Sequence, residues 1–314
     1  MDRIKQVLKY YYNIEVTNIQ SQQGGWASLA YKVSNEKHSY FLKVYEKSRA
    51  STPKLTERID AYVPIINWLY RNSDLKESIS VLLLTTEGNY KCEDDEGVYL
   101  LYDFIEGTTI GDRVLTEKQI QQLSEIIAHL HLYGEEISVK TESIKEDFSV
   151  PFLEFFKEIL NSNNEHMAID IREIVSCYKT QINRLVRIVE KLAESLQLSD
   201  LRMALCHTDL HYWNLMESQD KLIIIDWEGL KLAPVEADLM FLMDKPYFNT
   251  FLKIYQDTHE NFELNHEALH FYQGRRKLED IGEFLEQLIF DSLSEQERMN
   301  TIDYLDEELR SISL

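Results

Sequence analysis

The chain has 314 residues, with 54 acidic and 33 basic side chains and a formal net charge of -21. Apolar residues make up 44% of it, which is enough to build packed cores and excludes a compositionally disordered chain. The length predicts about two domains. Proteins that bind a phosphate backbone normally carry a basic face, so the charge argues against nucleic acid as a partner. An acidic surface either attracts a small cationic substrate or simply keeps the protein in solution.

The sequence shows no feature of a membrane or secreted protein. No run of about 18 uncharged apolar residues occurs, so we expect no membrane span. The first twelve residues lack the apolar stretch of a secretory signal. Cys92, Cys177 and Cys206 are widely spaced and follow no metal-binding pattern, which indicates reduced thiols. We therefore expect a cytoplasmic protein, and the sequence leaves its oligomeric state open.

The first third of the chain has the pattern of a small sheet with helices. A helix is predicted over residues 1–12, and the paired glycines near residue 24 predict a turn. A second helix, over 55–70, has one apolar face and contains Pro64, which predicts a kink or a late start. Strands are predicted over residues 14–20, 29–34, 39–45, 80–85 and 98–105.

From residue 106 onward the pattern becomes mainly helical. Thr116 is the predicted N-cap of a helix that reaches Tyr133. Further helices are predicted over 175–197, 235–242, 249–259, 267–291 and 294–310. We therefore predict an α+β chain with an N-terminal nucleotide-binding lobe at 1–106 and a larger helical lobe at 107–314. A ligand is expected in the cleft between these lobes.

The most informative motif is the run CHTDLHYWN at residues 206–214, followed by IIIDW at 223–227. Asp209 is the candidate catalytic base, which would accept the proton of a substrate hydroxyl. Asn214 and Asp226 are candidate magnesium ligands, because magnesium prefers hard oxygen atoms. This spacing is the kinase arrangement for transferring phosphate from a nucleotide. An alternative is a transition-metal site, because His207, Asp209 and His211 would share one face of a strand.

These motifs resemble the family of aminoglycoside phosphotransferases and choline kinases, small-molecule kinases related to the protein kinases. Residues 207–214 follow the family pattern His-Gly-Asp-Leu-His-x-x-Asn, except that Thr208 replaces the usual Gly. The resemblance extends from about Ile14 to Asp291. Trp213, together with Tyr255 and residues 275–280, resembles the spectinomycin phosphotransferase branch. The resemblance implies a two-lobed protein-kinase-like fold, Mg²⁺ as cofactor and ATP or GTP as co-substrate.

The resemblance also implies which residues hold the nucleotide phosphates. Lys43, flanked by strand apolar residues, matches the lysine that contacts the inner phosphates. Its acid partner is expected on the following helix, where Asp60 is preferred to Glu57.

Two further segments are implied to contact the nucleotide. The segment with Gly24, Gly25 and Ser28 resembles the hairpin that covers the phosphates, since glycines let main-chain amides approach phosphate oxygens. Main-chain groups near Asp103 and Ile105 would hydrogen-bond the purine, without indicating which purine is used.

The predicted activity is transfer of the terminal phosphate to a hydroxyl of a small, polar and cationic molecule. An aminoglycoside or aminocyclitol antibiotic is the first candidate, which would make the role antibiotic resistance. A metabolic kinase for choline, homoserine or a sugar shares the same residues, because the fold does not fix the acceptor. A nucleotide-binding protein without turnover is the less favoured alternative. Acids that could hold a substrate ammonium, or instead brace a helix, are Glu236, Asp238, Asp280 and Glu283.

Overall fold

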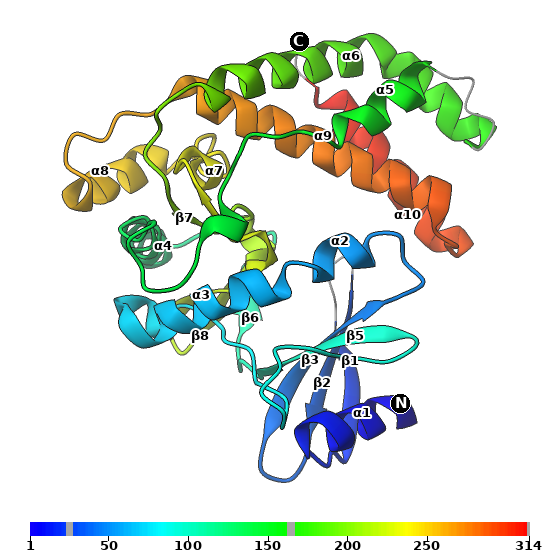
Figure 1. Ribbon diagram of the computed structural model, residues 1–314, viewed down its shortest axis with the longest axis vertical. Helices are drawn as coiled ribbons and strands as arrows, with labels where there is room; N and C mark the ends of the chain where they lie inside the picture. The colour runs from blue at the N-terminus through cyan, green and yellow to red at the C-terminus, as the bar shows by residue number, and fades with distance from the viewer. Residues whose placement is uncertain (23–27, 162–166, 313–314) are drawn as a thin grey trace. The chain divides into compact units, whose positions relative to one another are not determined.

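The computed structural model describes residues 1–22, 28–161 and 167–312. They form two compact units, each assembled from separate stretches of the chain. The first unit joins Met1–Lys145 to Met203–Phe262, and the second joins Glu146–Arg202 to Glu263–Leu314. An antiparallel sheet near the N-terminus and a helical C-terminal region confirm the predicted fold class (Figure 1). The predicted lobe boundary at residue 106 falls inside the first unit and stays a prediction.

The first unit contains an antiparallel five-stranded sheet in the order β1-β2-β3-β5-β4. Its strands are β1 (Asn18–Gln22), β2 (Leu29–Ser34), β3 (Ser39–Glu46), β4 (Cys92–Glu93) and β5 (Gly97–Asp103). Lys43 lies near the middle of β3, opposite Ala30 on β2 and Leu100 on β5. The predictions for β2, β3 and β5 are confirmed, and β1 begins later than the predicted strand at 14–20.

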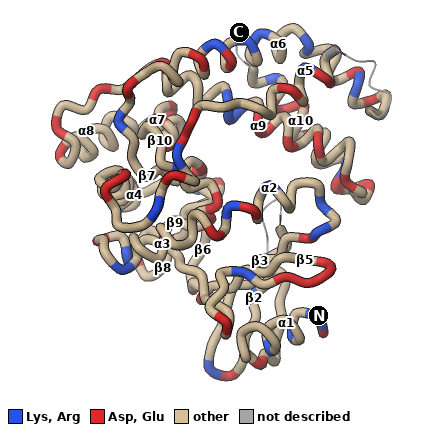
Figure 2. Tube along the Cα trace, viewed as in Figure 1, with Lys and Arg blue, Asp and Glu red and all other residues tan. Residues whose placement is uncertain are grey.

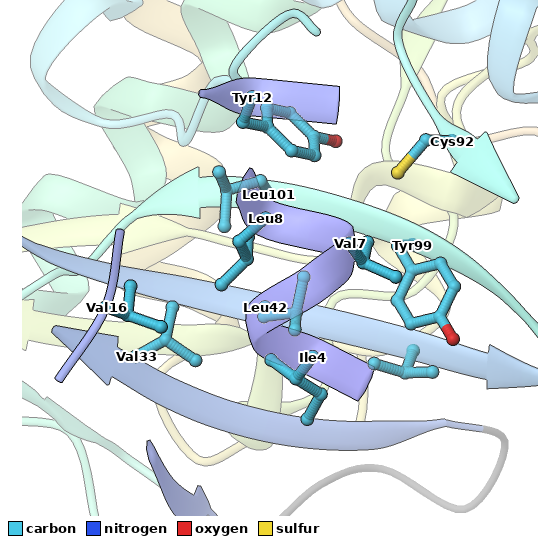
Figure 3. Close-up of a cluster of buried hydrophobic side chains, with 11 residues drawn as sticks. Ile4, Val7, Leu8, Tyr12, Val16, Val33, Leu42, Cys92, Tyr99 and Leu101 are labelled. Atoms are coloured by element: carbon cyan, nitrogen blue, oxygen red, sulfur yellow. The ribbon is translucent and has the colours of Figure 1, made fainter. Parts of the chain in front are cut away.

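Helix α1 (Asp2–Tyr12) covers one side of this sheet. Its apolar side chains, spaced three and four residues apart, share one helical face and pack on the strands (Figure 3). The buried cluster consists of Ile4, Val7, Leu8, Tyr12, Val16, Val33, Leu42, Val44, Cys92, Tyr99 and Leu101. Leu42 belongs to this cluster, so its neighbour Lys43 points to the opposite face of the sheet, where the site lies.

The helix predicted over residues 55–70 consists of two helices. The short α2 (Thr52–Thr56) ends before Glu57, and α3 (Ile59–Asn72) starts two residues later. Pro64 lies inside α3, where it lacks the N–H that would bond to the carbonyl of residue 60. Helix α3 starts later than predicted, at Ile59, but Pro64 is its sixth residue and does not account for that start.

The prediction of a strand at residues 80–85 is wrong. This apolar segment makes one isolated bridge, from Leu82 to Tyr102, and no continuous ladder. The main-chain nitrogens of Thr85 and Thr86 instead bond to Asn89 and Tyr11, which turns the chain away from β5. Apolar composition alone did not distinguish a packed, irregular segment from a strand.

The remaining elements of the first unit include those that carry the motif at residues 206–227. Thr116 and Gln119 form a capping box at the start of α4 (Glu117–Leu130), as predicted from the cap residue. The other helices are η1 (Asp74–Glu77), η2 (Glu142–Ile144), η3 (Tyr212–Asn214), η4 (Trp227–Gly229), α7 (Glu236–Leu239) and α8 (Phe248–Thr258). The strands are β6 (Thr108–Thr109), β7 (Ala204–Cys206), β8 (Leu215–Ser218), β9 (Lys221–Ile224) and β10 (Lys231–Ala233).

The second unit is helical. It contains α5 (Leu153–Asn161), which the sequence did not predict, α6 (Ile169–Gln197), α9 (His266–Phe290) and α10 (Glu295–Arg310). Both α6 and α10 pack against α9. Within this unit the buried carboxylate of Glu146 pairs with Arg275 at 3.0 Å. Asp and Glu residues are spread along the chain in the helices and loops of each unit (Figure 2). Within the described ranges, none of the helices is long and apolar enough to cross a membrane.

Candidate active site

The predicted catalytic motif forms a loop between β7 and the β8–β9 hairpin. Strand β7 ends at Cys206 and pairs with β10, while β8 begins directly after Asn214. The hairpin returns through β9 to Asp226, which precedes η4. The main-chain nitrogen of Ile225 donates to the carbonyl of Asn214 at 3.0 Å, so the two predicted metal ligands lie at the same end of the β8–β9 hairpin, just before β8 and just after β9.

His207 is fully buried and supports this loop through its ring nitrogens. Its Nε2 bonds the carbonyl of Ile225 at 2.9 Å, and its Nδ1 accepts the main-chain N–H of Asp209 at 3.2 Å. Its ring also packs edge-on against Trp227. Because both ring nitrogens have protein partners, the alternative transition-metal site with Asp209 and His211 is not favoured.

Asp238 anchors the loop through its main chain. Its Oδ1 accepts from the nitrogen of Thr208 at 2.6 Å, and its Oδ2 accepts from the nitrogen of His207 at 3.0 Å. The same Oδ2 lies 3.0 Å from Nε2 of His131. Asp238 is fully buried. Its carboxylate therefore braces the loop, and the alternative in which it binds a substrate ammonium has no support in this geometry.

Thr208 occupies a strained position. Its φ is 66°, in the left-handed region that glycine adopts freely, which explains why the family pattern has Gly here. Its Oγ1 donates to the carbonyl of Gly229 at 2.7 Å. Gly229 has no room for a side chain, because a Cβ would lie 2.6 Å from this Oγ1 and 2.9 Å from the carbonyl oxygen of His207.

Asp209 and Asn214 are in direct contact. The Asn214 amide nitrogen donates to both the main-chain oxygen and Oδ2 of Asp209, each at 2.9 Å. His211 Nε2 lies 3.3 Å from the same Oδ2. These contacts hold one carboxylate oxygen of Asp209, as the orientation of a general base requires. They also leave the amide oxygen of Asn214 as the group that could bind a cation.

Lys43 reaches this region from the five-stranded sheet. Its Nζ donates to Oδ1 of Asp226 at 3.1 Å and to Oε1 of Glu228 at 2.6 Å. The hydroxyl of Tyr45, two residues along β3, donates to the same Glu228 oxygen at 2.7 Å. The structure therefore brings Lys43 and Asp226 together, although 183 positions separate them in sequence.

Burial and the charges of the neighbouring groups act in opposite directions on the pKa values of these three groups. Burial alone would lower the pKa of Lys43, but the carboxylates of Asp226 and Glu228 outweigh it and raise that pKa well above its usual range. Burial raises the pKa of Asp226, and the attraction of Lys43 only partly offsets this effect. For Glu228, burial is opposed by Lys43 and by the Tyr45 hydroxyl, which together lower its pKa. Lys43 and Glu228 are thus held as an ion pair.

The donor set fits a magnesium ion. Asp226 presents a carboxylate that is 39% exposed and accepts a hydrogen bond from Lys43 at 3.1 Å. Asn214, the last residue of η3, adds an amide oxygen directly before β8. Hard oxygen ligands of this kind suit Mg²⁺, which keeps several waters and bridges nucleotide phosphates.

Asp60 does not pair with Lys43, contrary to the preferred prediction. Its side chain is 66% exposed and lies 3.8 Å from Lys91. The alternative, Glu57, is also exposed, in the break between α2 and α3. Position along the sequence could not predict which acid pairs with Lys43. Helix α3 starts only at Ile59, and both Glu57 and Asp60 are exposed.

The other residues predicted to contact the nucleotide are Gly24, Gly25, Ser28, Asp103 and Ile105. Gly24 and Gly25 lie outside the described residues, whereas Ser28 is buried just before β2. Asp103 ends β5 and is exposed, and Ile105 follows it two residues later in a half-buried position. Their roles at the phosphates and the purine stay predictions.

Sequence reasoning missed the functional surroundings of the motif. Sequence patterns did not place Glu228 beside Lys43, and they assigned no role to Tyr45. The signal that could have pointed to Glu228 is its position two residues after Asp226, in the single turn η4.

Comparison with known proteins decides the family. The sequence model of the phosphotransferase enzyme family, APH, matches residues 18–281. The chain belongs to this family. The match includes every residue of the site described above, from Lys43 on β3 to Asp238 on α7. No curated protein sequence matches the chain significantly.

Solved structures of other phosphotransferases share the fold. Spectinomycin phosphotransferase APH(9)-Ia, solved with ADP and spectinomycin, superposes with a TM-score of 0.71 at 23% identity, covering 99% of this chain and 98% of that one. Choline kinase LicA from Streptococcus pneumoniae gives 0.64 at 16% identity, covering 99% and 98%. An amicoumacin kinase solved with AMP-PNP gives 0.61 at 14% identity, covering 98% and 93%. The APH chain is thus a small-molecule phosphotransferase whose acceptor these likenesses do not determine.

Proposed function

We propose that this phosphotransferase moves the terminal phosphate of ATP or GTP to a hydroxyl of a small, polar and cationic molecule. The observation that carries the proposal is the convergence of four side chains from separate elements. Asn214 binds Asp209 at 2.9 Å, and Lys43 binds Asp226 at 3.1 Å. A base, two oxygen ligands for a cation and a lysine for phosphate are the parts that phosphoryl transfer requires.

In this proposal Asp209 orients the acceptor. The carboxylate oxygen that Asn214 does not hold accepts the proton of the acceptor hydroxyl. The hydroxyl oxygen then forms a bond to the terminal phosphorus as the bond to the bridging oxygen breaks, and the nucleoside diphosphate leaves. Most of the acceleration comes from positioning and charge neutralisation, because Asp209 forms no covalent bond with the substrate.

Asn214 and Asp226 would hold Mg²⁺, which supplies positive charge to the phosphate oxygens when bound. Lys43 binds the inner phosphates through its ammonium group, whose three N–H donors include two that contact Glu228 and Asp226. The third donor is available for a phosphate oxygen. Ser28, with Gly24 and Gly25, covers the phosphates, and main-chain groups near Asp103 and Ile105 bind the purine.

An aminocyclitol or aminoglycoside antibiotic is the first candidate acceptor. The charge of -21 attracts a polycationic molecule to the protein surface. Transfer of phosphate would add negative charge to such a drug and change what binds it, so the role would be antibiotic resistance in the cytoplasm. Trp213, directly before the metal ligand Asn214 and 46% exposed, is consistent with the spectinomycin phosphotransferase branch.

The experiment is an acceptor panel. Magnesium-dependent consumption of ATP and of GTP is measured with spectinomycin, aminoglycosides, choline, homoserine and sugars. We expect stimulation by an aminocyclitol or aminoglycoside and product with one added phosphate by mass spectrometry. Stimulation by choline, homoserine or a sugar alone would instead establish the metabolic alternative. Nucleotide binding without stimulation by any acceptor would contradict the proposal as stated.

A further inference from the structure

Lys43 has an acid partner that does not come from the helix where one was expected. Glu228 accepts its shortest hydrogen bond, at 2.6 Å, and lies on the single turn η4 that follows Asp226. The side chains of Lys43 and Glu228 are 11% and 14% exposed. A hydrogen-bonded pair of opposite charges at this depth is far less screened by solvent than a surface pair.

Tyr45 fixes the position of Glu228. Its hydroxyl donates to the same Oε1 that accepts from Lys43, at 2.7 Å, and its ring is 1% exposed. Lys43 and Tyr45 are two residues apart on β3, so both side chains point to the same face of the sheet. Glu228 is therefore held by two donors on one rigid strand.

Helix α3 presents an aromatic residue to this cluster where an acid was expected. Tyr62 is buried on α3, and its pKa is raised first by burial and then by the negative charge near Tyr102 and Glu228. Asp60 points instead toward Lys91 and solvent. Asp60 is the one acidic residue of α3, so no buried carboxylate of this helix is available to Lys43.

We propose that Glu228 is the positioning residue for Lys43. It orients the ammonium group toward the inner phosphates and so takes the role expected of an acid on α3. The inference rests on the proposed role of Lys43 in nucleotide binding. One consequence is that the orientation of Lys43 depends on the turn that carries Asp226, rather than on the position of α3.

The main rival is that Glu228 acts as a magnesium ligand. The two roles predict different thermodynamic couplings. A residue that acts through Lys43 has no effect once Lys43 is removed, and its effect persists without metal. A magnesium ligand keeps its effect in the absence of the lysine and loses that effect when the metal is removed. A double-mutant cycle separates these cases.

The test measures ADP affinity by calorimetry, with Mg²⁺ and with EDTA, for Glu228→Gln, Lys43→Ala and the double variant. We expect Glu228→Gln to weaken ADP binding about tenfold in both conditions, because the lysine loses a charged, hydrogen-bonded partner. In the Lys43→Ala background the same change should have less than about a twofold effect. Tyr45→Phe should weaken binding less than Glu228→Gln does.

A matched control is Glu46→Gln, since Glu46 also lies on β3 and pairs with Arg49 outside the cluster. It should leave ADP affinity unchanged. Additive losses in the double variant, or a loss for Glu228→Gln seen only with Mg²⁺, would overturn the inference while leaving the proposed function intact. Unchanged ADP affinity in Lys43→Ala would overturn the nucleotide role of Lys43 itself, and the inference with it. A larger loss of ADP affinity for Asp60→Asn than for Glu228→Gln would show that Asp60 on α3, and not Glu228, positions Lys43.

Discussion

The carboxylate of Asp238 accepts a hydrogen bond of 2.6 Å from the main-chain nitrogen of Thr208, the residue directly before the proposed base. Its second oxygen accepts from the nitrogen of His207. Asp238 therefore fixes the main chain that carries Asp209, although it lies on a different element, α7. The geometry of the base depends on a residue that need not touch a substrate.

Asp238→Asn should damage both stability and turnover. The amide offers one acceptor in place of two, so a buried donor from Thr208, His207 or His131 is left facing an NH₂ group. An unsatisfied buried donor costs about 1–3 kcal/mol of unfolding free energy. The measurement is urea unfolding followed by circular dichroism, together with kcat.

The control for this change is Asp220→Asn. Asp220 is 86% exposed and pairs with Lys118 at 3.5 Å, so its loss should cost well under about 1 kcal/mol. Equal unfolding midpoints for the two variants would contradict the bracing role of Asp238.

Gly229→Ala should displace the catalytic loop. The added Cβ would lie 2.6 Å from Oγ1 of Thr208 and 2.9 Å from the carbonyl oxygen of His207, and the second of these atoms belongs to the main chain. Overpacking of this kind costs about 1–3 kcal/mol. We expect a lower melting temperature and a reduced kcat with acceptor.

Gly282→Ala provides the comparison for this variant. A Cβ there meets the Phe156 ring at 3.4 Å, an ordinary contact, and alanine favours the helix by about 1 kcal/mol over glycine. The melting temperature of Gly282→Ala should be equal to or higher than that of the wild type. A Gly229→Ala protein as stable and active as the wild type would show that the loop adapts and that the close approach is unimportant.

The three cysteines should differ sharply in reactivity. Cys177 is exposed on α6, whereas Cys92 and Cys206 are buried. Burial raises the pKa of the Cys92 thiol to about 12, so it stays protonated and unreactive at pH 8. Labelling with iodoacetamide at pH 8 should add one group per native chain and three per unfolded chain. Modification of Cys92 at the rate of Cys177 would contradict the described packing.

The raised pKa of Cys92 also predicts that the free energy of unfolding falls at alkaline pH. Its folded pKa lies above the value of about 8.5 in an unfolded chain, so its contribution is full below that pH and falls as pH rises toward 12. Unfolding free energy should therefore decrease between pH 9 and 11, and the decrease should be smaller in Cys92→Ala. An identical pH dependence in the two proteins would exclude this assignment.

Local sequence patterns were sufficient for part of the site. Lys43 stands among strand apolar residues, and Asp226 follows a run that forms β9, so their positions on β3 and after β9 follow from neighbouring residues, whereas the role of Lys43 came from the resemblance. The spacing of Asp209 and Asn214 likewise fixed their contact, because the short η3 turn brings them together.

The partner of Lys43 could not be predicted in this way. Asp60 was preferred for its place on the following helix, but the choice between α3 and η4 depends on how each packs against β3. The prediction of a strand at residues 80–85 was wrong for the same reason. The main-chain nitrogens of Thr85 and Thr86 bond to the carbonyls of Asn89 and Tyr11, and the composition of the segment does not reveal these partners. Tertiary packing overrides local preference at such positions.

The most direct test of the account is the comparison of Asp209→Asn with the wild type in acceptor-stimulated formation of ADP. If Asp209 is the base, kcat should fall by about 10²–10⁴-fold, while the affinity for ADP with Mg²⁺ stays within about twofold, because Lys43, the proposed phosphate contact, is held by Asp226 and Glu228. Turnover retained within about tenfold of the wild type, in a variant that binds nucleotide normally, would contradict the role of Asp209 as the catalytic base.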